Sequence, residues 1–184
     1  MKLMIINGSV REGRRADTVQ AWVVGVLNQD TELMLDVVDL KELDLPFFNE
    51  ALNPSDANGQ FKNPKGTAWA ARVAAADAFL FITPEYNHGP SAVLKNAIDW
   101  VYDGWLNKPI GFVSYGGVAG GTRAVQQLLQ NVLHVKMFPI SANVAIPNIS
   151  TAFDEHVKPN FPSLDDNLHK SVADIKQLHY RLRA

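Results

Sequence analysis

Segments rich in apolar residues alternate with amphipathic helical patterns along this chain, and this alternation constrains its fold more than any other feature. Apolar segments occur at 3–6, 33–40, 78–83, 109–115 and 141–146. Between them, apolar residues recur at helical spacing from residue 18, at 67–77, after Ser91, around 125–133 and from Ser163. Strands that alternate with helices build a parallel sheet. We therefore predict an α/β fold, with a doubly wound five-stranded parallel sheet and helices on both faces.

Length and composition limit the class of protein. The 184 residues are expected to form one domain over 1–184. A net charge of -2 leaves no basic footprint for nucleic acid or an anionic membrane. The sequence has no cysteine, which excludes disulfides, thiolate metal sites and a cysteine nucleophile. No apolar stretch approaches about 18 residues and the N-terminal run is too short for a signal peptide, so we expect a cytoplasmic protein.

The loop after the first predicted strand carries groups that can bind an anion. It reads Gly8-Ser9-Val10-Arg11 and continues through further arginines to Asp17-Thr18. Ser9 offers a hydroxyl and Arg11 offers a fork of N–H donors. The helix that follows adds unpaired N–H groups and a partial positive charge, a combination that binds phosphate. The loop lacks the Walker and Gly-x-Gly-x-x-Gly patterns. The alternative is a solvated turn with surface arginines.

Two further loops are expected at the same edge, because ligands of a doubly wound sheet bind at the carboxyl ends of its strands. The loop after the third strand reads Pro84-Glu85-Tyr86-Asn87-His88-Gly89-Pro90-Ser91. Its prolines and glycine restrict the backbone, which suits a planar heteroaromatic ligand. The loop after the fourth strand, 114–122, contains four glycines that allow close approach of a ligand. A flexible hinge is the alternative for this last loop.

Patterns of other active sites are missing from the sequence. Gly-x-Ser-x-Gly does not occur, which argues against an α/β-hydrolase nucleophile. The five histidines show no His-x-x-x-His spacing on a helix, so no zinc-protease site or other metal site is predicted. Asp36 and Asp39 lie three residues apart on a predicted strand and should point to opposite faces, which indicates structural roles.

A long loop at 45–63 does not fit the alternating pattern. It is rich in proline, glycine and asparagine and contains Phe47, Phe48 and Phe61. Long loops within compact domains are usually functional or disordered. Two interpretations remain open: the aromatic side chains pin the loop to the core, or they line a pocket or a partner surface.

Three segments carry a family resemblance when taken together. They are Gly8-Ser9-Val10-Arg11, the stretch from Pro84-Glu85-Tyr86-Asn87 to Lys95-Asn96-Ala97-Ile98-Asp99-Trp100, and Ser114-Tyr115-Gly116-Gly117. They resemble the NADPH-dependent FMN reductase family, which includes quinone, azo-dye and chromate reductases on a flavodoxin-like fold. The resemblance extends over roughly residues 1–147, and the central stretch is its specific part.

The resemblance implies FMN at these three loops, with NADPH or NADH as co-substrate. Ser9 and Arg11 would hold the phosphate. Many members close the phosphate cup with a serine or threonine; here Arg15 would close it, with Asp17 beside it and Thr18 as an alternative. Pro84, Glu85, Tyr86, Asn87 and His88 would border the isoalloxazine ring, and Ser114, Gly116 and Gly117 would meet its pyrimidine edge. An arginine near the nucleotide ribose would favour NADPH, with Arg14, Arg15 and Arg123 as candidates.

The implied activity is hydride transfer from nicotinamide to FMN and then to a small acceptor such as a quinone, free flavin, azo compound or metal oxyanion. The order would be ping-pong, and no protein side chain would be catalytic. The alternatives are a flavodoxin-like electron carrier, disfavoured by the arginine-rich first loop, and a flavin-free scaffold. A homodimer or homotetramer is also implied, with Phe47-Phe48 and 100–105 as candidate contacts.

Overall fold

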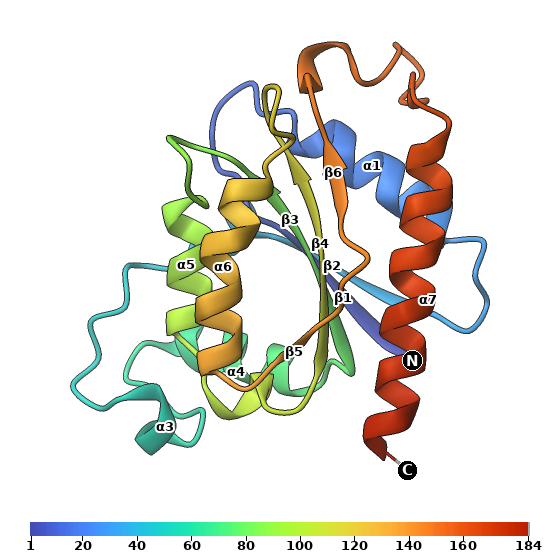
Figure 1. Cartoon of the computed structure of the whole chain (residues 1–184). Coiled ribbons are helices and arrows are strands. Elements are labelled where there is room, and N and C mark those ends of the chain that lie inside the picture. Colours follow the sequence, from blue (N-terminus) through green and yellow to red (C-terminus); the bar gives the residue numbers. More distant parts are fainter. Residues whose placement is uncertain (184) are drawn as a thin grey trace.

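The computed structural model describes residues 1–183 and shows a parallel sheet flanked by helices (Figure 1). Its strands are β1 (Lys2–Asn7), β2 (Met34–Asp39), β3 (Ala78–Pro84), β4 (Pro109–Tyr115), β5 (Phe138–Pro139) and β6 (Val144–Ile146). Its α-helices are α1 (Ala16–Leu27), α2 (Leu40–Leu43), α3 (Pro54–Ala57), α4 (Pro64–Ala74), α5 (Ala92–Asp99), α6 (Thr122–His134) and α7 (Ser163–Arg183). Two short 3₁₀ turns occupy Asp103–Trp105 and Ile149–Thr151.

The sheet has the strand order β2-β1-β3-β4-β5, and all its pairs are parallel. This is the order of flavodoxin-like folds, so the predicted fold class is confirmed. Every residue of β3 and β4 is buried, whereas the edge strand β2 is mostly half-buried, with Met34 exposed and Val38 buried. The direction of winding reverses between β1 and β3, which marks the carboxyl ends of these two strands as the expected ligand position.

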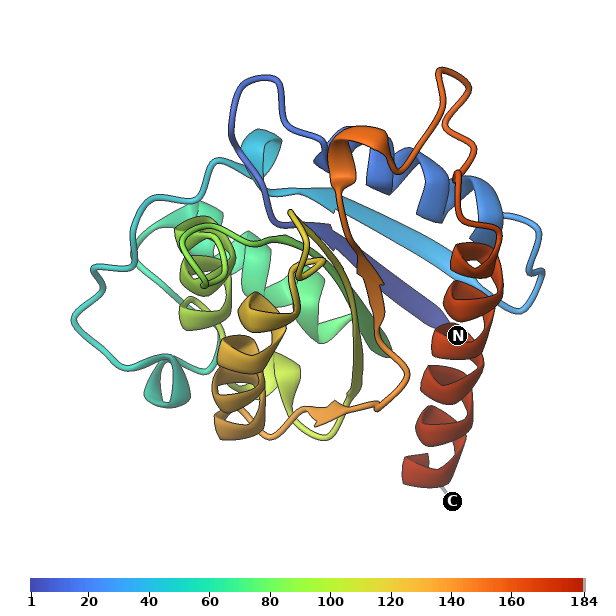
Figure 2. The ribbon, with the colours of Figure 1, turned by 45° about the horizontal axis from the view of Figure 1, so that its top comes forward.

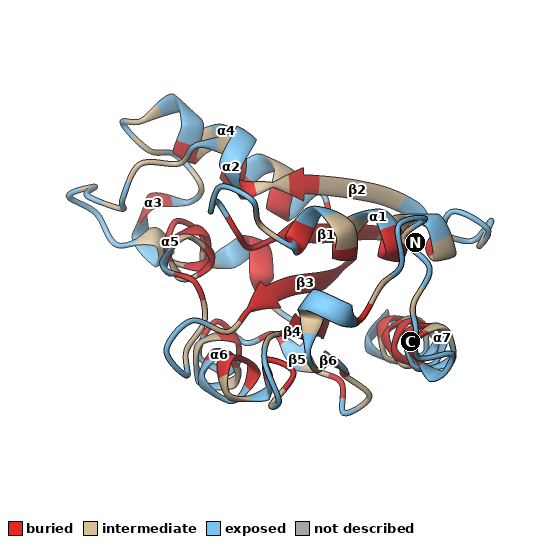
Figure 3. Cartoon of the chain, turned by 90° about the horizontal axis from the view of Figure 1, so that it is seen from above, coloured by how far each residue is buried: buried red, intermediate tan, exposed pale blue. Residues whose placement is uncertain are grey.

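Helices cover the two faces of the sheet in two groups. Figure 2 shows α1 and α7 together on one side and α4, α5 and α6 on the other. Seen from above in Figure 3, the buried residues form a layer along the sheet, with exposed residues on the outer sides of the helices. Each face therefore encloses its own hydrophobic core.

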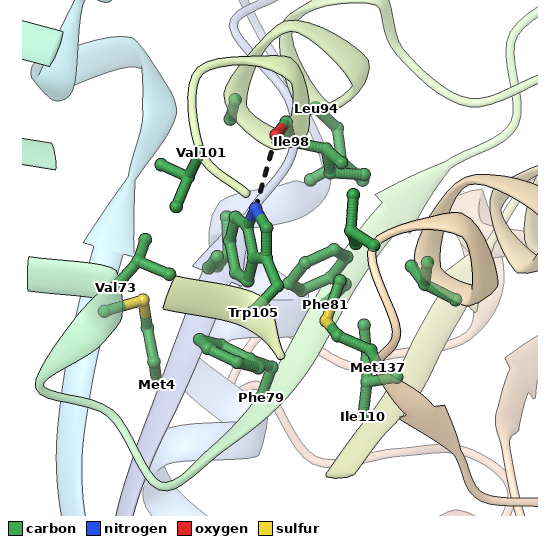
Figure 4. Close-up of a cluster of buried hydrophobic side chains, with 14 of the residues drawn as sticks. Met4, Val73, Phe79, Phe81, Leu94, Ile98, Val101, Trp105, Ile110 and Met137 are labelled. Carbon is green, nitrogen blue, oxygen red and sulfur yellow. Dashed lines mark hydrogen bonds between the residues drawn. The ribbon is translucent and has the colours of Figure 1, made fainter. Parts of the chain in front are cut away.

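The core under α4, α5 and α6 is built around Trp105, which is fully buried (Figure 4). Its ring centroid lies 4.7 Å from that of Phe79 and 6.0 Å from that of Phe81, with the rings tilted edge to face. The indole Nε1–H donates to the Ile98 carbonyl oxygen at 3.3 Å, which satisfies the one polar atom of the side chain. This rigid core supports the strand ends from which the site loops leave.

The fifth strand differs from the prediction of one segment at 141–146. The chain pairs with β4 in two separate pieces, first at Phe138–Pro139 and then at Val144–Ile146. Between them the Asn143 side chain interrupts the ladder, because its Oδ1 accepts the Phe112 N–H at 3.0 Å in place of a backbone carbonyl. The alternation of side chains along a strand cannot reveal that a side-chain oxygen accepts a hydrogen bond in place of a backbone carbonyl.

The loop at 45–63 is ordered against the core. Phe48 and Phe61 pack edge to face on Trp100, with ring centroids 5.2 and 5.3 Å away. The Pro46 carbonyl accepts hydrogen bonds from Trp100 Nε1 at 2.8 Å and Asn96 Nδ2 at 2.9 Å. Two of the three phenylalanines therefore pin the loop, as one of the two open interpretations held, whereas Phe47 is 74% exposed.

Helix α4 begins at Pro64, three residues earlier than the expected start at 67. Asn63 caps it by accepting the Lys65 N–H at 2.9 Å. A proline in the first turn loses no hydrogen bond, because that N–H has no partner within the helix. The short helices α2 and α3 were not predicted at all, since one turn is too short to show a period.

Candidate functional site

The loops after β1, β3 and β4 come together at one edge of the sheet (Figures 1 and 2). They surround a cavity of about 230 Å³, and one residue after β6 completes its wall. The residues that line it are Arg11, Arg14, Arg15, Pro84, Glu85, Tyr86, Tyr115, Gly116, Gly117 and Ile149. The structure thus brings together seven of the thirteen residues predicted for the site, namely Arg11, Arg15, Pro84, Glu85, Tyr86, Gly116 and Gly117.

The β1–α1 loop is held tightly against the sheet at its start. A Cβ on Gly8 would lie 2.9 Å from the Ile82 carbonyl oxygen, so only glycine fits at this approach. Ser91 donates from its hydroxyl to the Gly8 carbonyl and also caps α5. Ser9 is fully buried, and its Oγ lies 2.8 Å from Tyr86 Oη. The first two site loops are therefore joined by side-chain hydrogen bonds.

Beyond Ser9, this loop carries unpaired donors, and Arg11 and Arg15 line the cavity. Arg11 and Arg15 are exposed, and within residues 1–183 neither side chain forms a hydrogen bond or ion pair. The backbone N–H groups of Val10, Arg11 and Glu12 likewise have no acceptor among the described residues. Arg15 is the N-cap residue of α1, so the positive end of that helix faces the same region. These donors together suit an anion such as a phosphate.

Arg14 has the opposite role from its neighbours. Its guanidinium forms a bidentate ion pair with the Asp39 carboxylate at the end of β2, in which Nη1 lies 2.8 Å from Oδ1. Its Nε lies 2.8 Å from Asp17 Oδ1. It also donates to the Ser9 carbonyl. Burial raises the pKa of Asp39, but the hydrogen bonds from Arg14 and the Lys41 N–H, together with the positive charges of these two residues, outweigh burial and lower it. Arg14 thus anchors the loop to β2 and α1.

The remaining predicted residues of this loop are placed away from the cavity. Asp17 is engaged by Arg14. Thr18 lines a neighbouring hollow of about 240 Å³ together with Arg15 and Phe153. Of the two groups considered for closing the phosphate cup, only Arg15 lines the cavity itself.

The β3–α5 loop forms a tight turn at Tyr86–Gly89. Tyr86 and Gly89 exchange both backbone hydrogen bonds, at 2.9 and 3.0 Å. Asn87 and His88 between them have φ angles of 49° and 66°, as in a type I′ turn. Their side chains are exposed at the tip and do not line the cavity, although both were predicted to border a ring. Gln127 of α6 supports the tip by donating to the His88 carbonyl at 2.8 Å.

Glu85 connects this loop to the N-terminus of α6. Its carboxylate accepts from Arg123 Nε at 2.6 Å and from the Arg123 backbone N–H at 3.2 Å. Burial raises the pKa of Glu85, but the two hydrogen bonds from Arg123 and the nearby positive charge together outweigh burial and lower the pKa. Glu85 therefore stays ionised and paired, so it lines the cavity as a positioning group and not as a free base.

The β4–α6 loop turns back on its own strand. Gly121 has φ 83°, and a Cβ there would lie 2.7 Å from the Tyr115 nitrogen. Ser114 is buried and donates to the Gly120 carbonyl at 2.8 Å, so it braces the loop and does not reach the cavity. Gly116 and Gly117 do line it, and a Cβ on Gly117 would meet open space. The predicted hinge alternative is thus not needed to explain the glycines.

Three cavity residues were missed by the sequence reasoning. Arg14 was named only among candidate nucleotide ligands, although it lies in the arginine cluster. Tyr115 directly precedes the glycine pair, and that position at a strand end was the available signal. Ile149 follows β6 and has no local signal, because only the fold brings it to the wall. Asp36 and Asp39 bind different cations, Arg72 and Arg14, as their structural interpretation predicted.

A larger cavity of about 660 Å³ lies elsewhere, between the 45–63 loop, helix α5 and the C-terminal end of α6. Phe47, Phe48, Tyr102 and Val135 contribute to its largely apolar lining. It shares no residue with the cavity at the sheet edge. Among the described helices, none combines the length and apolarity needed to cross a bilayer.

Comparison with known proteins identifies relatives over most of the chain. The family model described as NADPH-dependent FMN reductase matches residues 1–151. An NAD(P)H-dependent FMN reductase of Schizosaccharomyces pombe is 35% identical over 147 residues, which is 79% of this chain and 74% of the relative. A probable NADPH:quinone oxidoreductase of rice, Oryza sativa subsp. japonica, is 36% identical over 190 residues, which is 100% of this chain and 91% of the relative.

A solved structure supports the same fold. The flavoenzyme NAD(P)H:(acceptor) oxidoreductase FerB of Paracoccus denitrificans superposes with a TM-score of 0.76 at 23% sequence identity. The match covers 96% of this chain and 97% of that one. At this identity the likeness shows the fold, which agrees with the strand order of the sheet.

Proposed function

Because this chain belongs to the NADPH-dependent FMN reductase family, we propose that it is an FMN-dependent NAD(P)H oxidoreductase that reduces small acceptors. The observation that carries the proposal is the cavity at the β1/β3 edge, where unpaired cationic donors and three site loops converge. This is the position at which a flavodoxin-like sheet binds its cofactor.

The residues of the cavity fit FMN at both ends of that molecule. Arg11, Arg15 and the free N–H groups of Val10 to Glu12 supply donors for a phosphate. Pro84 and Tyr86 provide apolar and aromatic surface, and Gly117 provides open backbone for a flat ring. Tyr115 adds a buried hydroxyl without a partner. The donor set therefore matches an anionic tail attached to a planar head.

Bound FMN supplies the redox chemistry, since it accepts hydride from a nicotinamide and passes electrons on. The chain's own residues bind and orient. The Glu85–Arg123 pair holds the loop that carries Tyr86, and the Arg14–Asp39 pair holds the loop that carries Arg11. A single open cavity suits a ping-pong order, in which the nucleotide leaves before a quinone, free flavin, azo compound or metal oxyanion takes its place.

The test is anaerobic mixing of the FMN-loaded protein with NADPH or NADH, followed by a quinone. We expect the nucleotide to bleach the flavin absorbance, and the quinone to restore it after nucleotide has been removed by gel filtration. A flavodoxin-like electron carrier would keep its absorbance after mixing with either nucleotide. A flavin-free scaffold would not take up FMN at all.

We also propose that the protein acts as a homodimer or a larger homo-oligomer. The support is the exposed side chain of Phe47, which lines the 660 Å³ cavity, and the exposed side chain of Leu52 further along the same loop. Phe47 is 74% and Leu52 58% exposed, although the loop that carries them is pinned to the core. Aromatic side chains held rigidly at a surface are typical of interface centres.

A further inference from the structure

Two buried side-chain groups within residues 1–183 have no hydrogen-bond partner, the hydroxyls of Tyr115 and Ser171. Buried hydroxyls are nearly always bonded, because loss of water without a replacement partner costs free energy. The two differ in place. Tyr115 lines the cavity at the sheet edge, whereas Ser171 of α7 packs beside Gly111 in the middle of β4.

The surroundings of Tyr115 explain why its hydroxyl is kept although it lacks a partner. Only 5% of the residue is exposed, and its ring packs in the core between the sheet, α1 and α7. Ser9, Tyr86, Arg14 and Asp17 surround the hydroxyl. Ser9, which is bonded to Tyr86, lies near enough to lower the pKa of the phenol, but it does not reach the hydroxyl with hydrogen-bond geometry. Arg14 is bonded to Asp39 and Asp17. The neighbouring polar groups are thus engaged elsewhere, and the hydroxyl is enclosed without a partner in a residue that lines the cavity.

The state of the phenol defines the partner it requires. Burial raises the pKa of Tyr115 well above its ordinary value, so the phenol stays protonated at neutral pH and donates a hydrogen bond. An acceptor is therefore the partner that would satisfy the hydroxyl hydrogen. On this wall, next to Ser9 and the arginine loop, the acceptor available from FMN is an oxygen of its polyol-phosphate tail.

We propose that Tyr115 is a binding residue whose hydroxyl donates to a tail oxygen of the flavin, and that it is left unpaired in the flavin-free protein for this purpose. The inference rests on the proposed function. It predicts that removal of the hydroxyl weakens flavin binding without lowering the stability of the flavin-free protein. A purely structural hydroxyl would behave differently, because its removal would lower stability.

The experiment compares Tyr115→Phe with Ser171→Ala, which removes the other unpaired buried hydroxyl away from the cavity. For Tyr115→Phe we expect the FMN Kd, measured by flavin fluorescence quenching, to rise about three- to tenfold. The flavin-free protein should melt at the same temperature or up to about 3 °C higher. Ser171→Ala should show a similar melting temperature and an unchanged FMN Kd.

Riboflavin, which lacks the phosphate, identifies the acceptor. If Tyr115→Phe weakens riboflavin as much as FMN, the partner is a polyol oxygen; if only FMN binding weakens, the partner is the phosphate. Equal FMN affinity of wild type and Tyr115→Phe would overturn the inference, and so would a flavin-free variant that melts several degrees lower. Failure of the wild type itself to bind FMN would instead overturn the proposed function.

Discussion

Residues of one type take different roles in the β1–α1 loop, depending on whether a carboxylate lies within reach. Arg14 is bound on two sides by Asp39 and Asp17, whereas Arg11 and Arg15 have no such partner within the described chain. A guanidinium paired in this way contributes to stability, and an unpaired one is available to a ligand. The arginines that we propose to bind the phosphate are thus distinguished from Arg14 by their lack of a protein partner.

We predict that Arg11→Ala weakens FMN binding by about ten- to a hundredfold, because a hydrogen bond to a charged group contributes about 1.5–3 kcal/mol. Flavin absorbance after gel filtration and circular dichroism on the same sample measure occupancy and folding. Riboflavin affinity should change far less, because riboflavin has no phosphate. Arg181→Ala on the exposed side of α7 is the matched control. Unchanged occupancy in Arg11→Ala would remove Arg11 from the phosphate site.

At the scale of elements, the site loops are fastened to strands and helices by ion pairs. Glu85 joins the β3 loop to α6, and Asp39 joins the end of β2 to the β1 loop. The Arg14 and Asp39 side chains are only 8% and 14% exposed, so their pairing is partly desolvated. Removal of one partner leaves the other charge buried, which is strongly destabilising.

This ion pair predicts a pH dependence of stability. The fold lowers the pKa of Asp39 below 3.8, so its contribution is fully present above the unfolded value and is lost as pH falls through the folded value. Asp39→Asn should lower stability at pH 7 by on the order of 2 kcal/mol. The difference from wild type should shrink as the pH is lowered through the acid range.

Urea titrations from about pH 7 to pH 3 measure this effect. Asp44→Asn is the control, since Asp44 is 80% exposed and its pair with Lys65 is screened by solvent, so a smaller change is expected. If the free energy of unfolding of wild type and of Asp39→Asn differed by the same amount at every pH, the assigned role of the pair would be contradicted.

At the scale of the whole molecule, the exposed apolar surface around Phe47 lies on the face of the sheet opposite α7. We predict that Phe47→Asp shifts the protein towards the 20.3 kDa monomer with little change in melting temperature of the single chain, because the side chain is exposed there. Light scattering after gel filtration measures the mass. Tyr180→Asp, which places a charge on exposed α7, should leave the mass unchanged. A monomeric wild type would contradict the proposed assembly.

Much of the architecture follows from local pattern. The buried runs of β3 and β4 and the apolar stripes of α1, α5 and α6 repeat at periods that only one element type can satisfy. The interruption of the fifth strand could not be predicted from the sequence, because there the Asn143 side chain replaces a main-chain acceptor. Helices α2 and α3 were not predicted, because a single helical turn is too short to show a repeating pattern of apolar residues.

The sequence by itself determined the order of strands and helices, and therefore that the loops after β1, β3 and β4 would share one edge, since parallel strands end on the same side. Only the tertiary structure decided which side chains of those loops are free. Arg14 and Ser114 are turned to internal partners, Ile149 joins the wall, and the Tyr115 hydroxyl is left without a partner. The reason is physical: periodicity is a property of neighbours in sequence, whereas pairing and burial depend on residues that meet only after folding.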